Sequence, residues 1–109
     1  MKILLVRPLE KPVVTEIEDT LENLQKIVGG YIEIVPFFDD GSLFVCNEEG
    51  KLLHLPLNRA ITDEDGNMMD IIAGTFFICN SDGCGNLTNL SDKLIEKYTK
   101  RFQYPEIYF

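Results

Sequence analysis

Six polar residues in the middle of the chain are the candidates for binding chemistry, because they lie within or beside apolar runs. They are Tyr31, Glu33, Asn58, Arg59, Asp70 and Thr75. Polar groups that folding buries must be hydrogen-bonded. In one interpretation Arg59 pairs with Asp70 while Asn58 holds loop backbone. In the other, Tyr31 and Glu33 rim a small polar pocket, where Tyr31 stacks on a ligand, Asn58 and Thr75 bond to it, and Arg59 binds an anionic group.

The residue types that usually carry catalysis occur in settings that do not favour it. Cys46 and Cys79 lie in apolar, strand-like runs, where a free cysteine behaves as a small hydrophobic residue. Cys84, in a glycine-rich loop, is predicted to be the most exposed cysteine. The single histidine, His54, lies in an alternating run typical of a strand surface. We assign no catalytic residue; a hydrolase that uses His54 or a cysteine would need a cleft that brings the two together.

Patterns that suggest metal or phosphate sites fail on spacing. An EF-hand loop beginning at Asp63 requires glycine and glutamate where Met68 and Gly74 stand. Cys79 and Cys84 form one loose pair, without the second pair that structural zinc usually shows. No glycine-rich stretch has the lysine and the spacing of a phosphate-binding loop. The sequence therefore predicts neither a metal nor a cofactor.

Length and composition indicate the class of protein. With 109 residues, of which 45% are hydrophobic and 26% charged, we expect one globular domain over residues 1–109. The formal net charge of −8 repels nucleic acid and favours basic partners, unless it serves only solubility. The apolar N-terminal run is too short for a secretory signal, and no window is long enough to span a membrane. The unpaired cysteines suit a reducing compartment, so we expect a cytoplasmic protein.

Apolar patterning predicts the strands. They cover residues 2–7, 13–18, 31–37, 43–46, 51–55 and 75–80. The first two form a hairpin, 43–46 pairs with 51–55 across the Asn47–Gly50 turn, and 75–80 lies centrally. Between them, 57–61 is expected to be a helical turn or a loop, 62–67 a polar turn, and 68–72 a short turn or helix.

Two amphipathic helices complete the predicted fold. The first is capped by Asp19, with Glu22 completing a capping box, and ends at the Gly29–Gly30 step. The second begins at Ser91, and its buried stripe consists of Leu94, Ile95, Tyr98 and Phe102. Because the strands mostly precede the last helix without βαβ alternation, the fold class is α+β: a mainly antiparallel or mixed sheet of about five to six short strands with two helices. The aromatic tail, 103–109, either packs on the body or meets a partner.

Four segments resemble a small family known as domain of unknown function 3846. They are LENLQKIVGGYIE (21–33), CNEEGKLLHLPLNRAI (46–61), DIIAGTFFI (70–78) and LSDKLIEKYTKRF (90–102). The resemblance covers nearly the whole chain, with residues 79–89 departing most from the family. It implies a context, not an activity: phages, plasmids and integrative conjugative elements of Gram-positive bacteria, whose small acidic proteins often act against host defence.

We therefore expect a non-enzymatic accessory protein of a phage or mobile element, acting in counter-defence in the bacterial cytoplasm by sequestering a small polar, nucleotide-like ligand. The alternative is an acidic inhibitor that mimics nucleic acid and binds a basic groove of a host defence or restriction enzyme. That alternative requires carboxylates gathered on one side, drawn from Glu16, Glu18, Asp39, Asp40, Glu48, Glu49, Asp63, Glu64 and Asp65. Neither function involves direct binding to nucleic acid or to a membrane, and a homo-oligomer is left open.

Overall fold

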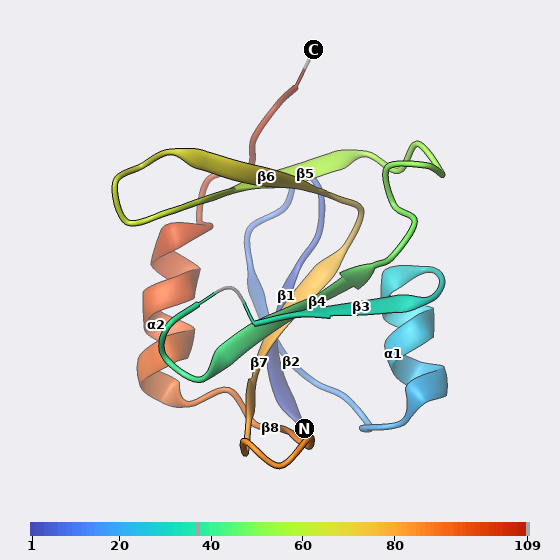
Figure 1. The fold of residues 1–109 in the computed structure, drawn as a ribbon, viewed down its shortest axis with the longest axis vertical. Helices are drawn as coiled ribbons and strands as arrows, with labels where there is room; N and C mark the ends of the chain where they lie inside the picture. The colour runs from blue at the N-terminus through green and yellow to red at the C-terminus, as the bar shows by residue number, and fades with distance from the viewer. Residues whose placement is uncertain (37, 109) are drawn as a thin grey trace.

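The run Phe76–Ser81 becomes the central strand of an α+β fold. The structure, a computed structural model, describes residues 1–36 and 38–108, and over these it contains eight strands and two helices (Figure 1). The elements are β1 Lys2–Val6, β2 Val13–Glu16, α1 Leu21–Val28, β3 Ile32–Val35, β4 Ser42–Asn47, β5 Leu57–Thr62, β6 Met68–Ala73, β7 Phe76–Ser81, β8 Leu87–Thr88 and α2 Asp92–Arg101. The predicted fold class is confirmed.

The main sheet has the strand order β2-β1-β7-β4-β3, with β8 added beside β7. Every described strand pair is antiparallel. The register places Leu4 and Phe44 on either side of Ile78, and Leu5 and Val45 on either side of Phe77. Because successive side chains of a strand point to opposite faces, these two rows belong to the two faces of the sheet. The prediction that the 75–80 run lies centrally is confirmed.

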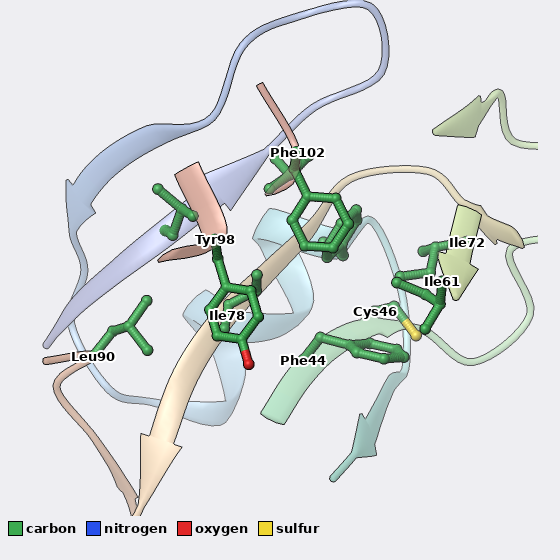
Figure 2. Packing of buried hydrophobic residues seen from close by; sticks show 11 residues of the cluster. Phe44, Cys46, Ile61, Ile72, Ile78, Leu90, Tyr98 and Phe102 are labelled. Atoms are coloured by element: carbon green, nitrogen blue, oxygen red, sulfur yellow. The ribbon is translucent and has the colours of Figure 1, made fainter. Parts of the chain in front are cut away.

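Each face of the sheet carries its own hydrophobic core. Helix α1 covers one face, where Leu24 and Val28 pack against residues such as Phe77. Helix α2 covers the opposite face, where Tyr98 and Phe102 pack against Ile78 and its neighbours (Figures 1 and 2). Figure 1 shows the sheet between the two helices. Strands buried on both faces read as continuous apolar runs, which explains the composition of β1 and β7.

Strands β5 and β6 form a separate two-stranded sheet, seen at the top of Figure 1, and their Ile61 and Ile72 belong to the core on the α2 face. The predictions of a turn or loop at 57–61 and of a turn or helix at 68–72 were therefore wrong. The predicted hairpin of 43–46 with 51–55 was also wrong, because residues 51–54 form turns and β4 pairs instead with β3 and β7. Pairing with the distant β7, which begins with four apolar residues, buries more apolar surface than pairing with the KLLH segment, which has a charged residue and a histidine. The polar turn predicted at 62–67 is confirmed over 63–67, which form the β5–β6 connection, whereas Thr62 is the last residue of β5.

Both helices begin and end near the predicted residues. Thr20, rather than Asp19, is the N-cap of α1, and its side chain accepts a hydrogen bond from the Asn23 backbone. Gly29 ends that helix in the left-handed conformation, and Ser91 caps α2 as predicted. The last residue of the predicted 31–37 strand and the last of the aromatic tail lie outside the described residues. Neither helix has the length and apolar composition needed to cross a lipid bilayer.

A hydrogen-bond network around Asp40 attaches the β3–β4 connection to α2. The hydroxyls of Ser42 and Tyr98 both donate to the Asp40 carboxylate. The Ser42 backbone N–H and the Lys97 Nζ donate to it as well, each at 3.0 Å. Burial raises the pKa of Asp40, but the hydrogen bonds from Ser42, Tyr98 and Lys97 together outweigh burial and hold this pKa well below its usual value of 3.8.

Replacing Asp40 by asparagine is expected to lower the free energy of unfolding by about 1–3 kcal/mol at neutral pH, because charged hydrogen bonds are lost. The folded-state pKa lies below the unfolded one, so the contribution of Asp40 is complete above about pH 5 and is lost as the pH falls. Urea unfolding from pH 7 down to pH 3 measures both effects. The exposed neighbour Asp39, changed to asparagine, is the control. Equal stability and equal pH dependence of the two variants would contradict this role.

Candidate functional site

Asn58 and Arg59, the most conspicuous polar pair of the sequence, lie in β5 and are completely buried. The Asn58 Nδ2 donates to the carbonyl oxygens of Val6 and Gly74, both at 2.9 Å. Its Oδ1 accepts from the Arg59 Nη1 at 2.8 Å. The amide therefore joins β5 to the end of β1 and to the β6–β7 connection. The prediction that Asn58 holds loop backbone is confirmed.

The Arg59 guanidinium is held by backbone carbonyls. Its Nε and Nη2 donate to the Phe102 oxygen at 3.3 and 3.1 Å, and Nη2 donates to the Glu10 oxygen at 2.6 Å. Phe102 is the C-cap of α2, where the helix dipole places partial negative charge. Burial lowers the pKa of Arg59, and the charge of Glu106 acts in the opposite direction. The predicted pairing of Arg59 with Asp70 was wrong, because the carbonyls around the α2 end use its donors and Asp70 pairs with Lys51.

The structure does not bring the six predicted ligand residues together. Tyr31 precedes β3 and is 67% exposed, and Thr75 is half-buried between β6 and β7. Asn58 and Arg59 form internal hydrogen bonds. Across the described residues no buried side-chain nitrogen or oxygen lacks a hydrogen-bond partner. Of the six, only Glu33 and Asp70 line a shared pocket.

That pocket lies between the β3–β4 edge of the main sheet and β6 of the hairpin, and its volume is about 380 Å³. This is within the usual range for small-molecule sites, roughly 300–1,000 Å³. Its apolar lining consists of Val35, Phe44, Ile61, Met69, Ile71, Ile72 and Ala73. Its polar lining consists of Glu33, Asn47, Glu48, Lys51 and Asp70, together with the Cys46 thiol. Four buried lining residues, Cys46, Phe44, Ile61 and Ile72, form its floor, and Figure 2 shows their side chains close together.

Gly50 allows the β4–β5 connection to form one wall of the pocket. A Cβ on Gly50 would lie 2.7 Å from the Ala73 carbonyl oxygen, closer than a real Cβ contact. The β4–β5 connection can therefore pass directly against the end of β6 only with glycine there. That close approach places the next residue, Lys51, at the rim. Sequence reasoning missed this wall because it placed residues 51–55 in a strand.

The Cys46 thiol lies at the pocket floor, 3.9 Å from the Glu33 carboxylate oxygen that it faces. Burial raises the pKa of Cys46, and the negative charges of Glu33 and Asp70 raise it further, to about 12. At neutral pH the thiol is therefore protonated and a poor nucleophile. Cys79, in the other core, has its pKa raised to about 12 mainly by burial.

Lys51 and Asp70 form an ion pair at the rim of the pocket. Both side chains are more than half exposed, at 59% and 58%. Asp70 also accepts a hydrogen bond from the Ile71 backbone N–H at 2.8 Å. Burial raises the pKa of Asp70, but these two hydrogen bonds outweigh it and leave the pKa below its usual value. Asp70 therefore stays ionised at neutral pH, with oxygen lone pairs available to a ligand.

The residues considered for catalysis and metal binding are dispersed. His54 is exposed in a turn with a left-handed backbone (φ 53°), not in the strand that its alternating neighbours predicted. Cys84 is exposed, as predicted, whereas Cys46 and Cys79 are buried. The Asp63 carboxylate accepts two backbone hydrogen bonds within its own turn. Within residues 1–36 and 38–108, no group of three or more acidic, histidine or cysteine side chains has the arrangement of a metal site.

The carboxylates considered for an acidic face come from several connections. Asp40 and Asp63 are engaged in internal hydrogen bonds, and Glu16 pairs with the N-terminal ammonium. The other six are exposed: Glu18, Asp39, Glu48, Glu49, Glu64 and Asp65. They belong to the β2–α1, β3–β4, β4–β5 and β5–β6 connections, which Figure 1 shows at different ends of the molecule.

The fold and the pocket define a three-layer α+β protein, with a helix on each face of an antiparallel sheet and a hairpin that closes a pocket against the sheet edge. The model of the family described as Domain of unknown function (DUF3846) matches residues 1–103. The chain belongs to that family. Neither a curated protein nor a solved structure matches it.

Proposed function

We propose that the protein is a non-enzymatic binding protein that holds a small polar ligand in the pocket between β6 and the β3–β4 edge. The observation that carries the proposal is the combination of an apolar floor with ionised groups at the rim. Such lining is typical of sites that bury the body of a small molecule and orient it through a few polar contacts. The protonated, buried thiol of Cys46 supports binding rather than nucleophilic catalysis.

In keeping with the mobile-element context that the family resemblance implies, we propose a counter-defence role: an accessory protein of a phage or mobile element that sequesters a ligand in the host cytoplasm. The charges that line the pocket limit how a nucleotide-like ligand would bind. Arg59 is occupied in the core, and Lys51 is the only cation among the lining residues of the described pocket. A nucleotide would therefore enter by its base and leave its phosphates in solvent.

A thermal-shift screen of nucleosides, nucleotides, cyclic dinucleotides and small amines tests the proposal. A ligand at about 100 times its dissociation constant stabilises the folded state by roughly 2.7 kcal/mol. For a domain of this size that raises the melting temperature by roughly 10–20 °C. A screen in which no compound shifts the melting temperature, even at millimolar concentration, would contradict the proposal.

A matched pair of variants locates the binding. Val35→Phe adds volume to the pocket lining and is expected to abolish the ligand-induced shift. Ile34→Phe places the same ring on the opposite face of β3, where the side chain is 45% exposed, and should leave the shift unchanged. Loss of the shift in both variants, or in neither, would place the ligand elsewhere.

A further inference from the structure

The ionised groups around the pocket favour one sign of ligand charge. Glu33, Glu48 and Asp70 line it, and against these three carboxylates Lys51 is the one cation among the lining residues of this part of the chain. Asp70 is already held in its ionised form by hydrogen bonds. A pocket whose carboxylates outnumber its cations attracts positive charge and repels phosphate or carboxylate groups.

The negative potential extends to the floor. The charges of Glu33 and Asp70 both disfavour the thiolate of Cys46, and the opposing effect of Lys51 is the weakest of the influences on this sulfur. The floor residues Val35, Phe44 and Ile72 give this region an apolar surface. Charges interact more strongly across such an apolar region than in bulk solvent.

The Lys51 side chain has the chemistry that we expect of a ligand cation. It extends from the β4–β5 connection as an aliphatic chain, and its terminal ammonium donates to the Asp70 Oδ1. Since both partners are largely exposed, this ion pair contributes little to stability. A competing cation can therefore displace Lys51 from Asp70 with little loss of folding free energy.

We infer that the ligand of this pocket is an organic cation, a primary ammonium or amidinium group on a short aliphatic stem. This inference rests on the proposed function and names its ligand class. The stem packs on Val35, Ile61 and Ile72, and the cationic head lies between Glu33 and Asp70 in place of the Lys51 ammonium. The Cys46 thiol lies at the floor as a small hydrophobic surface for the stem.

Three probes of nearly equal shape test the charge preference: pentylammonium, 1-pentanol and pentanoate, titrated into ¹⁵N-labelled protein while the backbone amides of Cys46, Ile72 and Ala73 are followed by NMR. Pentylammonium is expected to bind about tenfold more tightly than the alcohol, the factor that one charged hydrogen bond adds, and pentanoate should bind most weakly. The preference should diminish with added salt, because the rim is open to solvent.

Substitutions test which side chains produce the preference for a cationic ligand. Glu33→Gln and Asp70→Asn are each expected to reduce pentylammonium affinity about tenfold without changing affinity for pentanol. Lys51→Met removes the internal competitor and should tighten ammonium binding. Glu64→Gln, an exposed carboxylate at the far end of the β5–β6 hairpin, is the control and should have no effect.

The relative affinities of the three probes decide whether the pocket prefers a cation. Equal binding of the three probes, saturable at the pocket amides, would overturn the preference for cations while leaving the proposed function intact. Tighter binding of pentanoate would overturn it as well. If none of the probes perturbs these amides at millimolar concentration, the cation inference fails, and the thermal-shift screen decides separately whether the pocket binds another class of molecule.

Discussion

Replacing Arg59 by methionine is expected to destabilise the protein by about 3–5 kcal/mol, because the buried Phe102 carbonyl, the Glu10 carbonyl and the buried Asn58 amide oxygen all lose this donor. Some buried ion pairs can be replaced by apolar residues at no cost, since both charged partners are removed together. Here the partners at Phe102 and Glu10 are backbone carbonyls, which no side-chain change removes. The loss is a large part of the 5–15 kcal/mol that typically stabilises a domain.

Thermal unfolding followed by circular dichroism measures this effect, and the expected fall in melting temperature is roughly 15–30 °C. Arg7→Met is the matched control. Arg7 is exposed, so its replacement should change the free energy of unfolding by less than about 0.5 kcal/mol. Arg59→Lys restores the charge but not the planar fork of donors, and should recover only part of the loss. A melting temperature unaffected by Arg59→Met would contradict the role assigned to the guanidinium.

Replacing Asn58 by alanine is expected to cost about 2–4 kcal/mol, because the buried Val6 and Gly74 carbonyls both lose the hydrogen bond from its amide. Asn58→Asp is a sharper variant. It keeps an acceptor for Arg59 but presents a carboxylate, which cannot donate, to the same two carbonyls. It should therefore destabilise the protein at least as much as alanine at neutral pH and recover as the pH falls and the carboxyl becomes protonated.

A double-mutant cycle of Asn58→Ala with Arg59→Met, measured by urea unfolding, tests whether the two residues act as one unit. Because the Arg59 Nη1 donates to the Asn58 Oδ1, the combined loss should be smaller than the sum of the single losses by about 0.5–3 kcal/mol. If the two losses add, the hydrogen bond between these side chains contributes little to stability, and each residue stabilises its own backbone contacts independently.

The elements predicted correctly have signals that are local in the sequence. The Phe76–Cys79 run is apolar at every position, which is typical of a strand buried on both faces of a sheet. Gly29 ends α1 through its left-handed backbone conformation, and Ser91 begins α2 through the hydrogen bond that its side chain accepts. The β5–β6 hairpin was missed because its alternation is interrupted: the strand pairing shifts between Leu57 and Arg59. The polar turn at 63–67, flanked by apolar residues on both sides, was the one signal that could have predicted it.

The candidate site was only partly predictable, for a physical reason. A buried arginine has the same sequence context whether it faces a ligand or a helix end, and only the three-dimensional position of Phe102 distinguishes the two. Glu33 and Asp70 were identified because polar residues in apolar runs are uncommon, and both line the pocket. Lys51 and Gly50 were missed because their role depends on how closely the β4–β5 connection approaches β6.

The position of β7 has a consequence for how the chain folds as it is synthesised. Strand β7 separates the β1–β2 hairpin from the β3–β4 hairpin, and its own residues contribute to the cores on both faces. Until residue 81 has left the ribosome, the two hairpins have no strand to join them, and α1 has no complete surface to pack on. Folding of the main sheet should therefore be delayed until β7 has emerged, with the two hairpins exposed to chaperones in the meantime.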